Sequence, residues 1–278
     1  MKKIMFILAT ALVMAACSND EPAPQDEVQY VSELKVAFTK GDTRVTAEHS
    51  SAGLTFEWDE DDIIGIIATD GSSKLLYIYD SETESFKPRY PYPGMEAGKE
   101  YFATRMHLNP TLTPDTKIID GKVAAVMKVC SDMGDGFIGI PMISDPFVAD
   151  PNGTVATMHH LTGVMEVPLK LAAGSDPKTI IFELYSSDDI PLPYFDAIPE
   201  EPYLQNVEVR WYSSQYVTGT YTLNADTYTS VFVPLTPGHY PSLKLRKMNT
   251  SNALHTFNDI TIQRGKITKV TPIVIDPS

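Results

Sequence analysis

The chain has 278 residues, of which 43% are hydrophobic, and its formal net charge at pH 7 is −14. This apolar content excludes a disordered chain, because such chains lack the apolar surface that offsets the entropy of ordering. The excess of carboxylates repels phosphate, which argues against nucleic acid and anionic membrane surfaces as partners. At roughly 150 residues per domain, the length predicts about two domains.

The start of the chain predicts an export signal. Lys2 and Lys3 are followed by an uncharged, mostly apolar run at residues 4–16, which ends in two alanines. Such a run is too short to span a bilayer, which takes about 20 residues. Small residues at the end of the run are what a signal peptidase requires. We therefore expect residues 1–16 to be a signal peptide.

Cys17 follows directly, and Met-Ala-Ala-Cys at residues 14–17 resembles the lipobox of bacterial lipoproteins. In that interpretation Cys17 is lipidated, and its acyl chains, at about 0.8 kcal/mol per buried CH₂, hold the protein on the outer membrane. The alternative is ordinary cleavage with Cys17 incidental. Residues 17–27 form an acidic, proline-containing tether, which resembles the surface-export signal of some outer-membrane lipoproteins. We expect a lipoprotein at the cell surface.

Most of the remaining chain has apolar residues at every second position, the period of a half-buried strand. In the first such run, Leu34, Val36 and Phe38 alternate with polar or small residues. Residues 63–68 are instead nearly all apolar, as expected of a strand that is covered on both faces. Further alternating runs lie at residues 123–129, 165–171, 180–184, 207–211, 231–235, 260–262 and 273–275.

Asp-Gly, Asn-Gly and Arg-Gly pairs separate these runs and predict turns. No window shows a convincing helical period, so the pattern predicts an all-β fold of antiparallel sandwiches. A Pro/Asp-rich stretch at residues 146–152 divides the chain into an N-terminal sandwich domain, 28–155, and a C-terminal one, 156–278. The proline-rich stretch 188–202 is expected to be a loop-like insertion on the second domain.

The sequence has no G-x-S-x-G, H-E-x-x-H or C-x-x-C motif and no phosphate-binding Gly-rich loop. We therefore expect neither an enzyme nor a bound cofactor. His159 and His160 are adjacent, so on a strand they point to opposite faces and cannot chelate one metal together. Cys130 ends an apolar run and is expected to be a small buried hydrophobe.

Two other clusters are candidates for binding. The acidic run at residues 59–62 could hold Ca²⁺, but it lacks the spacing of a known calcium loop, and a solvated turn is the favoured interpretation. Tyr203, Trp211, Tyr212 and Tyr216 form an aromatic-rich patch. Trp211 is expected in the core, whereas Tyr212 could stack on a sugar ring or be an ordinary surface tyrosine.

Several short patterns, taken in order, resemble the fimbrillin family, the pilins and related surface lipoproteins of the type V pilus. The family's W-x-x-G-D-x-I-G pattern corresponds to Trp58 and residues 62–66, with Asp61 in place of the first glycine. The other matching segments are the lipoprotein signal ending at Cys17 and residues 36–38, 43–44, 140–142, 160–167 and 265–268. The resemblance spans almost the whole chain.

This resemblance implies two tandem transthyretin-like β-sandwiches and a role in a surface fimbria. In the family, a trypsin-like protease cuts after an arginine behind the first strand, and that strand leaves. A C-terminal strand from another subunit then fills the groove by β-strand addition, in which backbone hydrogen bonds give affinity and alternate side chains fill pockets. The implied partners are other fimbrial subunits, the processing protease, the outer membrane through the lipid, and a host protein or glycan receptor.

Carried onto this chain, the resemblance assigns Arg44 as the cleavage site, within a short polar segment that a protease could reach. A plain loop arginine is the alternative. The core-facing residues of the displaced strand would be Leu34, Val36 and Phe38. The donor region would contain Ile273, Val274 and Ile275.

The sequence therefore predicts a structural subunit of a surface fimbria, of the tip or accessory type, assembled by protease-triggered strand exchange and supporting adhesion. The alternative is a non-polymerising surface lipoprotein that binds glycans or host ligands through exposed aromatic residues such as Tyr212. A hydrolase with an unrecognised site is a third possibility.

Overall fold

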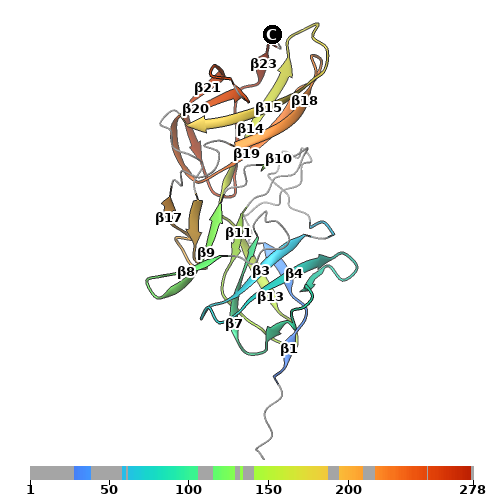
Figure 1. Cartoon of the computed structure of the whole chain (residues 1–278), viewed down its shortest axis with the longest axis vertical. Helices are drawn as coiled ribbons and strands as arrows, with labels where there is room; N and C mark the ends of the chain where they lie inside the picture. The colour runs from blue at the N-terminus through green and yellow to red at the C-terminus, as the bar shows by residue number, and fades with distance from the viewer. Residues whose placement is uncertain are drawn as a thin grey trace, which may run out of the picture.

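The computed structural model describes residues 28–38, 58–60, 62–105, 115–128, 132–133, 141–186, 194–208, 217–248 and 250–276. All regular elements in these ranges are strands, which confirms the all-β prediction. None of the described residues belongs to a helix long and apolar enough to cross a membrane. In Figure 1, the strands of the first half of the chain gather at one end of the long axis and those of the second half at the other.

A mixed sheet of eight strands forms most of the first half. Its members are β2 (Lys35–Phe38), β3 (Ile63–Ala68), β4 (Lys74–Asp80), β5 (Ser85–Pro88), β7 (Glu100–Arg105), β11 (Met142–Ser144), β12 (Phe147–Val148) and β13 (Val155–His160). Their order is β2-β13-β11-β7-β3-β4-β5, with β12 also paired to β7. Only β2 and β13 pair in parallel. Beside this sheet, β1 (Tyr30–Val31) pairs with β6 (Met95–Glu96).

Strand β3 is buried on both faces, as its continuous apolar sequence predicts. Ile64 and Ile66 enter a first core together with Phe86 of β5. Ile67 packs on the opposite face, in a smaller middle core that also contains Met127. The eight-stranded sheet therefore separates two hydrophobic cores.

A second sheet covers the middle core and joins the two halves of the chain. It contains β8 (Thr116–Ile119), β9 (Lys122–Lys128), β16 (Tyr194–Ala197) and β17 (Leu204–Glu208), in the order β17-β16-β9-β8. The prediction of a loop-like insertion at residues 188–202 is wrong for β16, because its strand pairs with β9 of the first half. Asp196 of β16 is buried and forms an ion pair with Lys117 of β8.

The second half is a sandwich of two sheets. One contains β10 (Asp132–Met133), β15 (Lys178–Ser186), β18 (Val217–Leu223), β20 (Gly238–Lys247) and β21 (Ala253–Ile262), in the order β10-β18-β15-β20-β21. The other contains β14 (Gly163–Leu171), β19 (Thr229–Leu235), β22 (Ile267–Lys269) and β23 (Ile273–Ile275), with β14 between β19 and the last two strands. A second core fills the space between them, with Phe182, Leu245, Val167 and Val233 among its members.

The change from one sheet to the next falls after His160. Strand β13 pairs with β2 and β11 of the first half, whereas β14 lies in the second sandwich. Residues 156–160, which the sequence assigned to the second domain, are therefore part of the first sheet. Only Leu161 and Thr162 separate β13 from β14, and both are buried.

Candidate functional site

The leading segment, residues 28–38, joins the two ends of the first sheet. Leu34 and Phe86 of β5 exchange two backbone hydrogen bonds, with N···O distances of 3.0 and 2.8 Å. The next residues form β2, which pairs with β13 at the opposite end of the sheet, and the Lys35 amide donates to the Thr154 carbonyl at 3.0 Å. The leading segment is thus an edge element that closes a curled sheet. We call its partners on β5, β6 and β13 the seat.

The apolar side chains of the leading segment face the first core. Leu34 is fully buried and Val31 is 5% exposed, whereas Val36 and Phe38 are half-buried and pack against the same core. The alternation that the sequence predicts for this strand is therefore present. Burying a side chain of this size stabilises the fold by about 1.5–3 kcal/mol, so Leu34 is a main anchor.

Tyr77 and Gly94 fit the seat closely to Val31. The Tyr77 hydroxyl donates to the Val31 carbonyl at 2.8 Å and accepts from the Met95 amide at 2.9 Å. Burial raises the pKa of Tyr77, so the hydroxyl keeps the proton that it donates. A Cβ at Gly94 would lie 2.6 Å from the Val31 carbonyl oxygen. Sequence reasoning missed both residues, because neither stands in a recognisable motif.

An aromatic cluster holds the far end of the leading segment. Phe38 stacks on Trp58 and His160, with ring centroids 6.0 and 6.5 Å apart. Trp58 also meets Phe86 edge to face at 4.7 Å, and the Arg105 guanidinium lies 5.3 Å from the centre of the Trp58 ring. Aromatic pairs of this kind contribute about 0.5–1.5 kcal/mol beyond area burial.

Arg105 is itself buried, at 4% exposure, and its Nη2 lies 3.2 Å from the Asp62 carboxylate. Burial lowers the pKa of Arg105, and the Asp62 charge opposes that shift. The sequence prediction of a solvated acidic turn is wrong for Asp62, whose side chain is only 14% exposed. Asp62 is an ion-pair partner under the aromatic cluster rather than a surface carboxylate.

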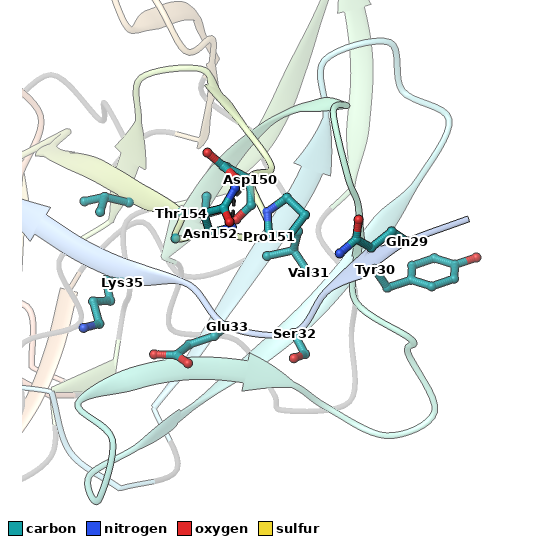
Figure 2. A pocket seen from close by; sticks show the side chains of 12 residues that line it. Gln29, Tyr30, Val31, Ser32, Glu33, Lys35, Asp150, Pro151, Asn152 and Thr154 are labelled. Atoms are coloured by element: carbon teal, nitrogen blue, oxygen red, sulfur yellow. Dashed lines mark hydrogen bonds between the residues drawn. The ribbon is translucent and has the colours of Figure 1, made fainter. Parts of the chain in front are cut away.

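A cavity of about 460 Å³ opens beside the leading segment (Figure 2). One wall is the leading segment from Gln29 to Lys35, and the other is the turn at residues 150–155. The turn is held by Thr154, whose hydroxyl accepts from the Asp150 amide at 2.8 Å. On this side the leading segment therefore borders open space rather than packed protein. Within the described ranges, no group of three or more His, Cys, Asp or Glu side chains could hold a metal ion.

The terminal segment, residues 267–276, is the corresponding edge of the second sandwich. Strands β22 and β23 both pair in parallel with β14, as β2 does with β13. Ile273 and Ile275 are 7% and 3% exposed, whereas Val274 between them is 52% exposed. The Ala172 amide donates to the Ile275 carbonyl at 2.9 Å. The terminal segment thus completes the sheet of its own half.

The regions around the two segments bury side chains at the same spacing. In the leading segment, Val31, Leu34 and Val36 face the first core. Near the end of the chain, Val270, Ile273 and Ile275 face the second core. Both sets follow the pattern i, i+3, i+5, so either stretch has the apolar pattern that the seat receives.

Replacing Gly94 with alanine is expected to loosen the leading segment, and Gly98→Ala is the matched control. Both glycines have positive φ, +117° and +79°, but a Cβ at Gly98 would meet nothing within 4 Å. Alanine at positive φ costs about 1–2 kcal/mol by itself. We expect Gly94→Ala to lose about 2 kcal/mol more than Gly98→Ala in the free energy of unfolding, measured with urea. Equal losses would contradict the close approach of Val31.

Other sequence-predicted residues fall elsewhere. His159 and His160 contact different partners: the His159 ring stacks on Tyr203 at 4.9 Å, and its Nε2 lies 2.9 Å from the Asp145 carboxylate. Tyr203 is buried, not part of a surface patch, and burial together with Asp145 raises its pKa to about 12. The predictions for Cys17, Arg44, Cys130, Trp211, Tyr212 and Tyr216 lie outside the described residues.

The architecture is that of an all-β protein closed at both chain ends by parallel edge strands. No family model and no curated protein matches the chain. Among solved structures, it is similar to a candidate cell adhesion protein from Bacteroides ovatus, with a TM-score of 0.55, 11% sequence identity, and coverage of 90% of this chain and 93% of the other. At this identity, the similarity shows a shared fold.

Two further solved structures are similar at lower scores. A candidate cell adhesion protein from Bacteroides uniformis has a TM-score of 0.46 and 15% identity, covering 91% of this chain and 94% of the other. A fimbrial protein from Bacteroides ovatus has a TM-score of 0.41 and 11% identity, covering 91% of this chain and 52% of the other. The fold neighbours are therefore of the kind that the sequence resemblance leads one to expect.

Proposed function

We propose that this chain is a structural subunit of a cell-surface fimbria, of the tip or accessory type, that supports adhesion. It is exported as a lipoprotein through Cys17 and cleaved after Arg44. The leading segment then leaves its seat, and the terminal segment of another subunit takes its place. The fold shared with a candidate cell adhesion protein supports the surface role.

The observation that carries this proposal is the position of the leading segment. It touches the sheet only at its two ends, β5 and β13, so its departure leaves the rest of the strand order intact. It would expose two unpaired strand edges and the buried side chains of Phe86, Ala156 and Met158. Unpaired edges of this kind are templates for a strand from another chain.

The terminal segment has the properties of a suitable donor. It is already an extended edge strand in parallel pairing, and Val270, Ile273 and Ile275 repeat the spacing of the side chains that fill the seat. The seat and the terminal segment also lie at opposite ends of the molecule, as the positions of β1 and β23 indicate (Figure 1). A contact between two different ends is heterologous, and such contacts produce open filaments when the rotation does not close.

The experiment is cleavage of the purified lipid-free chain with an arginine-specific protease. We expect the wild-type chain to acquire Val45 as its new N-terminus and to form fibres visible by electron microscopy. Arg44→Ala should remain monomeric, whereas Lys40→Ala, in the same polar segment, should assemble normally. Fibres formed by Arg44→Ala, or fibres whose subunits keep the leading segment, would contradict the proposal.

A further inference from the structure

The leading and terminal segments contact one and the same hydrophobic core. Val31 and Leu34 are buried in the first core, and Val36 and Phe38 pack against it. Ile267, the first residue of β22, also packs against this core. Of the described residues in the terminal segment, Ile267 is the one that reaches it, because Ile273 and Ile275 belong to the second core.

A continuous stretch of chain connects the two contacts. On β13, Ala156 and Met158 stand beside Val36 and Phe38 of the leading segment, and both are fully buried. Strand β13 continues through two buried residues into β14, whose second residue, Val164, is also fully buried in the first core.

Val164 is the direct neighbour of Ile267 in the parallel pairing of β14 with β22. The wall of the seat and the wall that holds the terminal segment are therefore successive parts of one strand path.

Strand β22 depends on few contacts of its own. Its pairing with β14 covers three residues, opposite Val164, Met165 and Glu166, and the Val270 amide closes it with a bond of 3.1 Å to the Glu166 carbonyl. When the leading segment is absent, the first core loses the side chains that cover it and water reaches the packing around Ile267. A short parallel pairing without its apolar contact is easily opened.

We infer that the two segments are energetically coupled: the leading segment, while seated, holds the terminal segment in its own sandwich, and its loss releases the terminal segment. The inference rests on the proposed function, in which both segments change partners. It adds a control on the donor, because a subunit with an occupied seat keeps its own strand sheathed. Coupling between two sites is reciprocal, so weakening the terminal contact must also loosen the leading segment.

Hydrogen exchange on the uncleaved monomer tests the coupling. Leu34→Ala is expected to speed exchange of the amides in the terminal segment, including Val270, about tenfold relative to wild type. Exchange in β15, within the second core, should change less than about threefold. Met127→Ala, a matched truncation in the middle core, should leave the terminal segment at the wild-type rate. An unchanged rate in Leu34→Ala, or an equal increase in β15, would overturn the inference.

The reciprocal pair needs no change in the leading segment, and it decides the matter if Leu34→Ala fails to fold. Ile267→Ala, which touches the first core, should speed exchange at residues 30–38 about tenfold. Ile273→Ala, which weakens the terminal segment only through the second core, should not. Equal effects of the two variants would overturn the coupling. Since no cleavage or fibre is involved, the coupling can fail while strand exchange holds, and the reverse.

Discussion

Aspartates at positions 273 and 275 are expected to abolish fibre growth, whereas an aspartate at position 274 leaves it intact. Ile273 and Ile275 are nearly fully buried and Val274 is half-exposed, so the alternate side chains of one short strand separate the two outcomes. A carboxylate carried into an apolar seat either keeps its charge at a cost of several kcal/mol or must take up a proton, and either change disfavours insertion. Fibre length by electron microscopy after cleavage is the measurement.

A mixing experiment distinguishes loss of donation from loss of folding. The cleaved Ile273→Asp, Ile275→Asp variant keeps an intact seat, so it should accept a wild-type terminal segment and then stop growth. Added to wild-type subunits in increasing ratio, it should shorten the fibres progressively, and the Val274→Asp variant should not. If the double variant is ignored by growing fibres while its near-UV circular dichroism remains native, the terminal segment is not the donor.

Replacing Arg105 with methionine is expected to cost about 3–5 kcal/mol in the free energy of unfolding, because it leaves the Asp62 carboxylate partly buried beside an apolar side chain. The guanidinium also covers the face of Trp58, which in turn stacks on Phe38 of the leading segment. The variant should therefore expose the leading segment to proteolysis as well. Guanidinium unfolding, followed by tryptophan fluorescence, measures the first effect.

The matched control is Lys87→Met, which breaks the ion pair with Asp80 at the protein surface. Exposed pairs of this kind contribute little, so its unfolding midpoint should stay close to that of wild type. Changing Asp62 to leucine in the Arg105→Met background removes the orphaned carboxylate and should recover most of the loss. A loss for Arg105→Met no greater than that for Lys87→Met would show that the buried pair does not stabilise the first core.

The sequence predicted the strands whose side chains alternate. Leu34 and Phe182 sit where the two-residue period places them, and the unbroken apolar run at residues 63–68 correctly indicated a strand covered on both faces. These predictions succeed because burial on a strand is a local property that follows from the period of two.

Pairing partners were harder to predict, because they depend on residues far apart in the sequence. The parallel pairings of β2 and β22 at the two chain ends have no local signature. The prolines on either side of β16 suggested a loop, yet they flank the strand, and its pairing with β9 satisfies the backbone. Tyr77 and Gly94 gain their role only once the Val31 carbonyl has been placed beside them.

The short connection between β13 and β14 has a mechanical consequence. The root of the terminal segment is fastened beside it, since the Gly265 amide donates to the Thr162 carbonyl at 3.0 Å and the Val164 amide to the Lys266 carbonyl at 2.9 Å. In a fibre built by strand exchange, tension enters along β13, crosses these few residues and leaves through the donated strand. Most of both sandwiches carries none of the load, so their outer faces are free to vary without weakening the fibre.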